Sequence, residues 1–514
     1  MKNNEIIDDY LKDESLLKGN ANNIFFCLNT TDVEQVLRNS YFNNVPITIQ
    51  GALTGICGGA VPYNGDILNL SKMDKIIDLK IDKDSNFILK VQPGLLLKDL
   101  NHFLNSKKFN VSNLDSLAAL NYKKFVDYAS LMFPSDPTET LASLGGMVAC
   151  EASGACSYMY GSIRKYIKGL KVVTPLKTLD IPRGLYKYKD LEKLLGVKIQ
   201  DLPSWTKPHE GIKDVAGLYY EDDMDLIDLF IGSEGIFGVI TEIDLLLINK
   251  PLKQIGLMLF LNNSSKLVEF VNWLRNNEFK KYNIAAIEYF DKSSFELLNR
   301  FRESVSAINK LPEISKDYDG GIYLEFHIDD DKQIESFFDI LNQQMSTFNI
   351  NQEEQWFAFE NNDYEKLKSF RHAVPECVNI LIANRKINDQ NVHKVGTDMS
   401  TSDDLLFDTI KMYNKDISSL DIESVIFGHI GNNHLHVNLI PSTELDCEIA
   451  KIQVLKWAKN IVSNDGSVSG EHGIGKIKKD MLKIMFSKSD LDEMKKLKKI
   501  LDPKSLINLG TFLD

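Results

Sequence analysis

The chain has 514 residues, of which 43% are hydrophobic and 25% charged, and its formal net charge is −13. This length allows two or three domains with buried cores, and the composition is typical of globular proteins. The negative charge argues against non-specific binding to nucleic acid, because a phosphate backbone requires a basic surface.

The sequence carries no recognisable targeting or membrane-spanning signal. The N-terminal stretch MKNNEIIDDY contains acidic residues and lacks the apolar core of a secretory signal. The apolar stretch LFIGSEGIFGVITEIDLLLI is interrupted by Ser, Glu and Gly. The six cysteines include no Cys-x-x-Cys pair, which indicates reduced thiols and no iron–sulfur cluster held by this chain alone. We therefore expect a cytoplasmic protein without a membrane span; contact with a membrane surface stays open.

Short strands and glycine-rich loops alternate in the first 250 residues. VPITIQ (45–50) and GDILNL (65–70) have the apolar character of buried strands. KIIDLKI (75–81) and FILKVQPG (87–94) flank a polar turn and predict a hairpin. Leucines at helical spacing after Gly94 predict a helix directly behind it.

Residues 251–444 contain fewer glycines and predict a separate α+β domain. Three apolar runs predict strands: IGLMLFL (255–261), AAIEYF (285–290) and GIYLEFHI (321–328). Ser264 is the expected N-cap of the helix that follows the first of these strands. The rest of the chain, residues 445–514, is predicted to be mostly helical.

Three stretches are rich in glycine: GALTGICGGAVP, SLGGMVACEASG and GSEGIFGVITE. Glycine permits positive φ angles and close approach of the backbone to a ligand, and successive N–H groups can bind a pyrophosphate. Each stretch alone is equally well explained as a tight turn. Three in one domain favour a dinucleotide site, although none has the G-x-G-x-x-G pattern of a Rossmann fold.

The stretch FGHIGNNHLHVNLI concentrates histidines around a Gly-Asn-Asn turn. If strands flank this turn, the period of two places His434, His436 and Asn438 on one face, within reach of His429 on the neighbouring strand. Imidazoles that converge on a carboxylate make a metal site, and Glu471 in SGEHGIG is the expected carboxylate. The alternative, a set of hydrogen-bonded sheet histidines, is less favoured because the residues cluster in glycine-rich loops.

Six motifs, taken in order, resemble those of the FAD-linked 2-hydroxy-acid dehydrogenases with a vanillyl-alcohol-oxidase-type flavin domain. They are GALTGICGGAVPYNGDILNL, FPSDPTETLASLGGMVACEASG, DLFIGSEGIFGVITE, GHIGNNHLH, SGEHGIG and LDPKSLINLG. The family includes D-lactate dehydrogenases, glycolate oxidase catalytic subunits and D-2-hydroxyglutarate dehydrogenases. The resemblance implies an α+β protein with a two-subdomain FAD-binding domain (1–250), an α+β, ferredoxin-like cap with the substrate site (251–444), and a C-terminal helical segment that returns to the flavin (445–514).

The resemblance also implies where FAD binds. The pyrophosphate is expected along Gly51, Thr54, Gly55, Gly58 and Gly59. The flavin and its ribityl chain are expected along Pro134, Asp136, Gly145, Gly146, Ala149 and Gly154. The adenine side is expected at Glu234, Gly235 and Val239. The first loop contains no histidine, so non-covalent FAD is expected. Three residues depart from the family pattern: Gln50 replaces a common Arg, Leu53 a usual Gly and Glu151 a usual Asn. Glu151 would add negative charge beside the flavin if it pointed inward.

The same resemblance implies a metal site. In the family, the residues that match His429, His436 and Glu471 bind a divalent metal, for which Zn is expected here, with Mn and Fe as alternatives. His434 stands where the family pattern has Asn and is an extra imidazole. It is a fourth ligand, a donor behind the ligands or a solvent-exposed side chain, and the last two are favoured because a two-His, one-carboxylate set leaves positions open for substrate.

The expected reaction is the oxidation of a D-2-hydroxy acid to the 2-oxo acid. The metal would acidify the substrate hydroxyl, His472 would take its proton as the catalytic base, and hydride would pass to flavin N5. Arg371 matches the arginine that binds the substrate carboxylate, and a guanidinium is suited to bidentate pairing. Asn438 matches a substrate-contacting Asn, and Lys394 is a further candidate.

Several alternatives stay open. D-lactate and glycolate are the favoured substrates, and D-2-hydroxyglutarate is the alternative. The electron acceptor would be an electron-transferring flavoprotein, an iron–sulfur protein, a quinone or oxygen. A catalytically silent FAD-binding electron-transfer subunit is less favoured because such members generally lack the His and Glu set, and a histidine-rich protein without flavin is disfavoured by the three glycine-rich stretches. The stretch 105–130 looks longer than the equivalent family connection.

Overall fold

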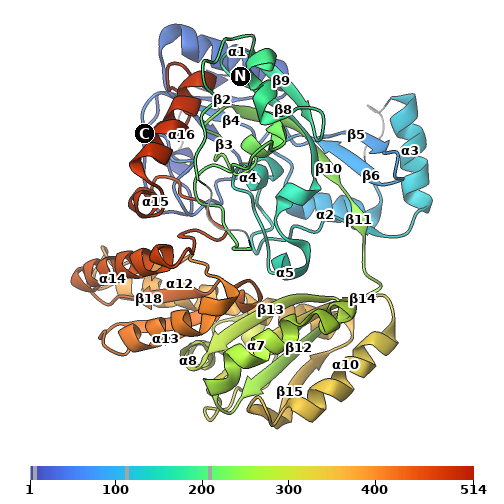
Figure 1. Cartoon of the computed structure of the whole chain (residues 1–514), viewed down its shortest axis with the longest axis vertical. Coiled ribbons are helices and arrows are strands. Elements are labelled where there is room, and N and C mark those ends of the chain that lie inside the picture. Colours follow the sequence, from blue (N-terminus) through green and yellow to red (C-terminus); the bar gives the residue numbers. More distant parts are fainter. Residues whose placement is uncertain (1, 4–7, 110–114, 207–210, 514) are drawn as a thin grey trace.

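The computed structural model describes residues 2–3, 8–109, 115–206 and 211–513. Figure 1 shows two parts, an N-terminal part that carries both chain ends and a second part built around one large sheet. The last helices of the chain return to the N-terminal part. The mixture of helices and sheets confirms the predicted α+β class.

The N-terminal part contains two main sheets. The first, in the order β1 (Lys2–Asn3), β2 (Asn23–Phe26), β4 (Asp66–Asn69) and β3 (Ile47–Gln50), has a parallel core of β2, β4 and β3 beside α1 (Thr30–Asn43). The second is antiparallel, in the order β5 (Ile76–Ile81), β6 (Phe87–Val91), β10 (Val239–Leu246), β8 (Ile167–Val173) and β9 (Thr178–Pro182). The predicted strands and hairpin of this part are confirmed, as is the helix after Gly94, α2 (Leu97–Ser106).

The second glycine-rich stretch forms a helix where a loop was expected. Gly145 and Gly146 lie within α4 (Leu144–Ala149). A Cβ added to Gly145 would lie 2.5 Å from the Cβ of Pro93, so glycine is needed here for close helix packing. The remaining short elements of this part are β7 (Leu131–Met132), α5 (Ser157–Tyr160), α6 (Leu191–Leu195) and β11 (Ile248–Asn249).

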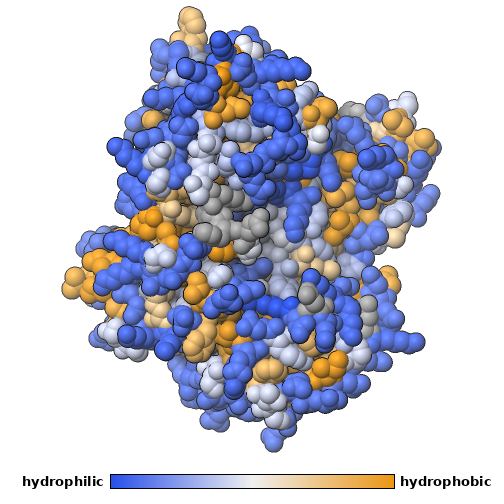
Figure 2. All heavy atoms as spheres, viewed as in Figure 1, coloured by the Kyte–Doolittle hydropathy of each residue, from blue (hydrophilic) through white to orange (hydrophobic). Residues whose placement is uncertain are grey.

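The stretch 105–130 is described only in part, because residues 110–114 lie outside the described residues. Its second half forms α3 (Ser116–Asp127), whose Asn121 donates to the Leu79 carbonyl of β5 at 2.9 Å. Leu117 and Leu120 on this helix are exposed. Figure 2 shows a mostly hydrophilic surface with apolar patches at this arm and over α14 (Glu444–Ser463).

A seven-stranded antiparallel sheet organises the second part. Its order is β15 (Ile350–Ala358), β12 (Lys253–Leu261), β14 (Gly320–Ile328), β13 (Ile284–Asp291), β17 (Glu423–Gly428), β18 (His436–Ile440) and β16 (Val395–Gly396). Along β12, Leu257 and Leu259 join the core under α7 (Leu267–Arg275) and α10 (Asp331–Gln344). Met258 and Phe260 join the opposite core, under the helices α8 (Lys292–Arg300), α11 (Asn361–Arg371) and α12 (Ala373–Lys386). Period-two alternation therefore gives the sheet two buried faces.

The second part also contains α9 (Ser306–Asn309) and α13 (Leu406–Ile417), whereas α15 (Lys479–Met485) and α16 (Lys488–Leu501) lie against the N-terminal part (Figure 1). The predicted N-cap at Ser264 is wrong, because Ser264 begins a short 3-10 turn and the cap is Asn263, whose side chain accepts from the Ser265 N–H. The chain end returns to the first sheet, where Ile507 pairs in parallel with Ile47.

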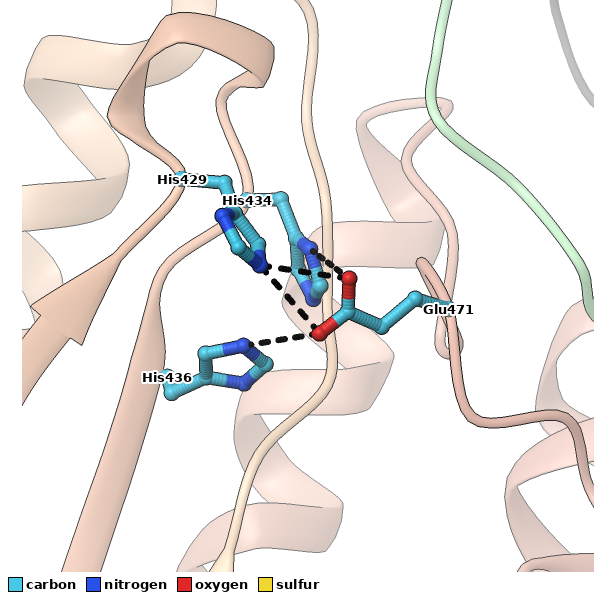
Figure 3. Close-up of side chains that lie close together, drawn as sticks. All are labelled: His429, His434, His436 and Glu471. Carbon is cyan, nitrogen blue, oxygen red and sulfur yellow. Dashed lines mark hydrogen bonds and ion pairs between the residues drawn. The ribbon is translucent and has the colours of Figure 1, made fainter. Parts of the chain in front are cut away.

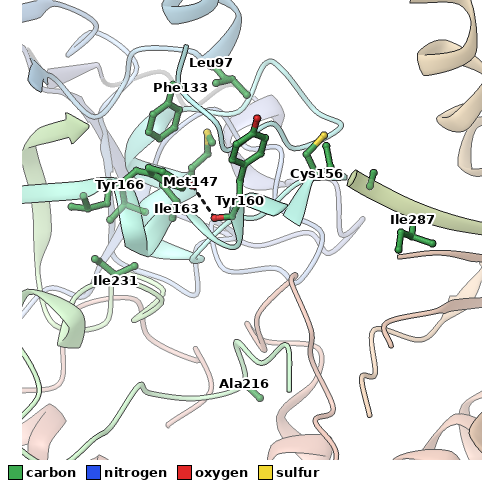
Figure 4. Close-up of a cluster of buried hydrophobic side chains, with 14 of the residues drawn as sticks. Leu97, Phe133, Met147, Cys156, Tyr160, Ile163, Tyr166, Ala216, Ile231 and Ile287 are labelled. Carbon is green, nitrogen blue, oxygen red and sulfur yellow. Dashed lines mark hydrogen bonds between the residues drawn. The ribbon is translucent and has the colours of Figure 1, made fainter. Parts of the chain in front are cut away.

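One hydrophobic core runs through both parts. Near α5, Cys156 and Tyr160 belong to the same buried cluster as Ile287 of β13 (Figure 4). The Tyr160 hydroxyl is 2.6 Å from Nδ1 of His327 on β14, which adds a polar contact across the boundary. Among the described residues, no helix is both long and apolar enough to cross a bilayer.

Asn508 holds the returning chain end and gives a test of this architecture. Its Oδ1 accepts from the Ile49 N–H at 2.8 Å and its Nδ2 donates to the Glu234 carbonyl at 2.9 Å, with 4% of the residue exposed. Asn508→Ala leaves two buried backbone groups unpaired, at about 2–4 kcal/mol. We expect thermal unfolding to shift down by roughly 3–8 °C. The exposed Asn460→Ala on α14 is the control, and equal melting of the two variants would contradict this role.

Candidate functional site

Three imidazoles and one carboxylate converge between the two parts of the protein (Figure 3). These four residues (His429, His434, His436 and Glu471) could hold a metal ion and are named the metal cluster. Nε2 of His429 lies 3.2 Å from Glu471 Oε2, and Nε2 of His436 lies 3.1 Å from Oε1. Nδ1 of His434 lies 3.9 Å from Oε2. The structure thus brings together the predicted ligands, and their donor atoms lie within 4.8 Å of one another.

Each imidazole of the metal cluster is held from behind by an acceptor at its outer nitrogen. His429 Nδ1 is 2.7 Å from Glu288 Oε1, and His436 Nδ1 is 3.3 Å from the Thr397 carbonyl. His434 Nε2 is 2.9 Å from Asp398 Oδ1. An outer N–H bond of this kind fixes the tautomer and leaves the inner nitrogen with its lone pair, as in protein metal sites. The arrangement fits a divalent ion.

His434 corrects two expectations. Its exposed fraction is 0%, so the prediction of a solvent-exposed side chain is wrong. It also lies before β18, which begins at His436, so it does not share a strand face with that residue. The chain bends here because Asn433 adopts a left-handed conformation at φ 52°.

Opposite charges balance one another around the metal cluster. Burial alone would raise the pKa of Glu471, but the Lys213 ammonium and the imidazoles hold it well below its usual range. Burial would lower the pKa of His429, but the carboxylates of Glu288 and Glu471 outweigh it and raise the pKa to about 9. Burial, reinforced by Lys213, lowers the pKa of His434 to about 3, so this imidazole is neutral.

Asp398 joins the metal cluster to the predicted base and was missed from the sequence. Its Oδ1 is 3.1 Å from His472 Nδ1 as well as 2.9 Å from His434 Nε2. Its Oδ2 accepts from the Ser469 hydroxyl at 2.6 Å and the Lys478 ammonium at 2.6 Å. The carboxylate therefore orients His472 so that Nε2, 3.5 Å from Glu471 Oε1, faces the metal cluster.

The loop that carries Glu471 and His472 is fastened to the glycine-rich stretches. Glu234 accepts from the N–H groups of Ile474 and Gly475, both at 2.7 Å. The Cys57 carbonyl accepts from the Lys476 N–H at 2.8 Å. The side chain of Glu234, which was expected on the adenine side of FAD, thus fixes the loop that carries Glu471 and His472.

The expected cofactor residues form a surface that fits a dinucleotide. No described residue accepts from the backbone N–H groups of residues 53–59, and a Cβ added to Gly55 or Gly59 would meet no atom within 4 Å. Unpaired N–H groups beside open space are suited to a pyrophosphate. Oδ1 of Asp136 is also buried without a partner among the described residues, and the Asp136 carbonyl would lie 2.3 Å from a Cβ on Gly154.

The other expected cofactor residues border this surface. Gly51 and Thr54 belong to the loop after β3, and Pro134 lies two residues before Asp136. Ala149 is the last residue of α4 and Val239 the first of β10, and Gly235 directly follows Glu234. Gly235 has a φ of 69° and Gly58 a φ of 76°, values at which glycine is favoured.

The departures from the family pattern have structural explanations. Glu151 points at Arg164, with Oε1 2.8 Å from Nε and Oε2 beside NH2, so its charge is balanced. Gln50 is fully buried and donates to the carbonyls of Tyr10 at 2.7 Å and Ala60 at 2.9 Å. Leu53 has a φ of 63°, a conformation that costs a side chain about 1–2 kcal/mol and that glycine would adopt freely.

Two cations of this region, Arg371 and Lys213, pair with carboxylates. Arg371, at the end of α11, is 5% exposed and pairs with Glu325 Oε2 at 3.2 Å, a partner that the sequence did not reveal. Lys213, which was also missed, lies 2.8 Å from Glu471 Oε2 and has 11% of its side chain exposed. Asn438 lies on β18, two residues beyond His436. Lys394 is exposed and donates to Asn379 at 3.1 Å, so the structure does not bring it to the metal cluster.

Comparison with known proteins agrees with this geometry. Residues 21–118 match a family described as FAD binding domain, and residues 257–511 match FAD linked oxidases, C-terminal domain. The chain belongs to the FAD-linked oxidase family. The predicted resemblance and the FAD-binding domain are therefore confirmed.

Similar proteins extend this assignment over the whole chain. A D-lactate dehydrogenase of Anaerostipes hadrus is 26% identical over 98% of this chain and 93% of its own length. The glycolate oxidase subunit GlcD of Bacillus subtilis is 24% identical over 94% and 87% of the two chains, and a D-2-hydroxyglutarate dehydrogenase of Stutzerimonas stutzeri is 24% identical over 95% and 90%. Among solved structures, an alkyldihydroxyacetonephosphate synthase superposes with a TM-score of 0.60 at 15% identity, over 96% of this chain and 77% of that one, which supports the fold.

The open space above Gly59 allows a direct test of the FAD surface. Gly59→Val fills volume that FAD would occupy, and overpacking of about 1–3 kcal/mol corresponds to a roughly 5–150-fold weaker Kd. We expect a folded protein that loses its absorbance near ~450 nm, the band of oxidised flavin, on gel filtration. Gly59→Ala, with a smaller side chain, is the matched control. Full flavin content in Gly59→Val would place the pyrophosphate elsewhere.

Proposed function

We propose that this FAD-linked oxidase oxidises a small D-2-hydroxy acid, D-lactate or glycolate, to the 2-oxo acid at the metal cluster. The observation that carries the proposal is the convergence of His429, His436, Glu471 and His472 beside the FAD-binding surface. The names of the similar dehydrogenases and of the glycolate oxidase subunit support the substrate class. The metal is proposed to be Zn, with Mn and Fe as alternatives.

The residues of the chain have distinct proposed roles. The metal, held by His429, His436 and Glu471, would supply Lewis acidity to the substrate hydroxyl, and non-covalent FAD would accept the hydride. His472 is the proposed base: Asp398 holds its Nδ1 proton, so Nε2 is free to accept the hydroxyl proton.

The substrate carboxylate requires a cation, and two are available. Arg371 is the proposed partner, although Glu325 already balances its charge, and Asn438 on β18 is a second proposed substrate contact. Lys213 contacts Glu471 and is the cation nearest to the metal cluster. A dicarboxylic acid would use both cations, which is the specific observation that favours D-2-hydroxyglutarate as the second candidate substrate. An electron-transferring flavoprotein, an iron–sulfur protein or a quinone is the proposed acceptor.

Anaerobic reduction of the bound flavin tests the proposed function. The absorbance near ~450 nm is followed while D-lactate, L-lactate, glycolate and D-2-hydroxyglutarate are added separately. We expect rapid bleaching by one of the acids in this panel other than L-lactate, loss of bleaching after chelation, and recovery when Zn²⁺ or Mn²⁺ is restored. Flavin that stays oxidised with every acid in the metal-restored protein would overturn the proposal in favour of a silent FAD-binding subunit.

His472→Gln tests the base. Removal of a general base slows the step it assists by about 10²–10⁴-fold, so flavin reduction should fall by this factor. FAD content and metal content should stay at the wild-type level because His472 supports neither in the proposed arrangement. His102→Gln, which changes an exposed histidine of α2, is the control. Unchanged reduction in His472→Gln would move the role of base to another residue.

A further inference from the structure

His434 is buried at the metal cluster, yet its inner nitrogen lacks a partner. Nδ1 has no hydrogen bond among the described residues, and the 3.9 Å to Glu471 Oε2 exceeds hydrogen-bond length. Its Nε2 is 2.9 Å from Asp398 Oδ1, so the proton resides on Nε2 and Nδ1 carries a lone pair. A buried nitrogen lone pair that has neither a hydrogen-bond donor nor a metal ion as its partner lowers the stability of the folded protein.

The metal cluster has the spacing of a coordination shell. Two donor atoms of a tetrahedral Zn site stand about 3.3 Å apart, and the separations from Glu471 oxygens are 3.1, 3.2 and 3.9 Å. The ring centroids of His434 and His436 are 4.6 Å apart. Each of the three rings has the same outer arrangement, a nitrogen on a carboxylate or carbonyl.

The ring of His434 is also locked in place. A Cβ on Gly470 would lie 2.9 Å from its Nε2 and Cδ2 atoms, so the neighbouring loop packs directly on the imidazole. Asp398, which fixes the ring from the other side, is itself held by Lys478 and Ser469. His434 therefore cannot turn its free nitrogen toward solvent without disturbing several contacts.

We propose that His434 is a third imidazole ligand, which binds the divalent metal through Nδ1, and that Asp398 orients this ligand and His472 together. The inference rests on the proposed metal at this site and extends the ligand set to three histidines and one glutamate. A 2-hydroxy acid that chelates through two oxygens would bring the coordination number to six. With His434 as a ligand, the alternatives Mn²⁺ and Fe²⁺ replace Zn²⁺ as the favoured ion, because they accept six ligands whereas Zn²⁺ is usually four-coordinate.

Proton NMR of the Co²⁺-loaded FAD protein counts the bound imidazoles. Each imidazole bound through one nitrogen retains a single N–H on the other, and in the paramagnetic protein this proton gives a strongly shifted signal that disappears in D₂O. We expect three such signals in the wild-type protein, from His429, His434 and His436. His434→Asn, which restores the residue of the family pattern, should leave two signals, and so should the control His436→Asn.

The affinity for Co²⁺, measured by competition with a chelator, is the second readout. Loss of an outer partner alone weakens metal binding by about 10–100-fold, so His434→Asn should weaken it by at least this factor. Two shifted signals in the wild-type protein, or unchanged spectra and affinity in His434→Asn, would overturn the role of His434 and leave the proposed function intact.

Other outcomes are equally decisive. Failure of the wild-type protein to bind Co²⁺ at all would instead contradict the proposed metal site. If His434→Asn does not fold, His472→Gln decides the assignment: three remaining signals support His434, and two identify His472 as the third ligand.

Discussion

The site depends on one buried carboxylate, that of Asp398. It accepts from the side chains of His434, His472, Ser469 and Lys478 and from the backbone N–H of His472. Burial would raise the pKa of Asp398, but His472 and Lys478 hold it well below its usual range, so the carboxylate stays ionised. Because an ionised carboxylate accepts several hydrogen bonds at once, a single residue aligns His434 with groups of the distant segment 469–478.

Much of the fold follows from the sequence because its signals are local. Apolar runs of six to eight residues predicted nine of the 18 described strands, and the order of motifs predicted the family. The exceptions are also local in cause. Gly145 and Gly146 suggested a loop, but both lie in α4, where the missing side chain of Gly145 allows the helix to pack on Pro93. The N-cap is Asn263 and not Ser264, and residue preferences for the N-cap position do not distinguish between two such neighbours.

The sequence indicated the candidate ligands but not the contacts that support them. His429, His436 and Glu471 are marked by clustering in glycine-rich motifs. Glu288 and Glu325 each occur alone in an apolar run that forms a strand buried on both faces. A buried carboxylate requires a polar partner, and this was the only signal in the sequence that either residue supports a site. Asp398 and Lys213 lie in irregular segments where no period constrains orientation, so only the three-dimensional structure brings them to the metal cluster.

The loop with Glu471 is anchored to the flavin part by Glu234 and Cys57, whereas His429 and His436 belong to the large sheet of the second part. The proposed divalent ion, if held by all of these residues, would therefore join the two parts of the protein through its ligands. Separation of the two parts would then break bonds between the ion and its ligands. By linkage, contact between the two parts would strengthen ion binding by the same free energy by which the bound ion strengthens that contact. Chelation would then loosen the junction as well as remove a Lewis acid.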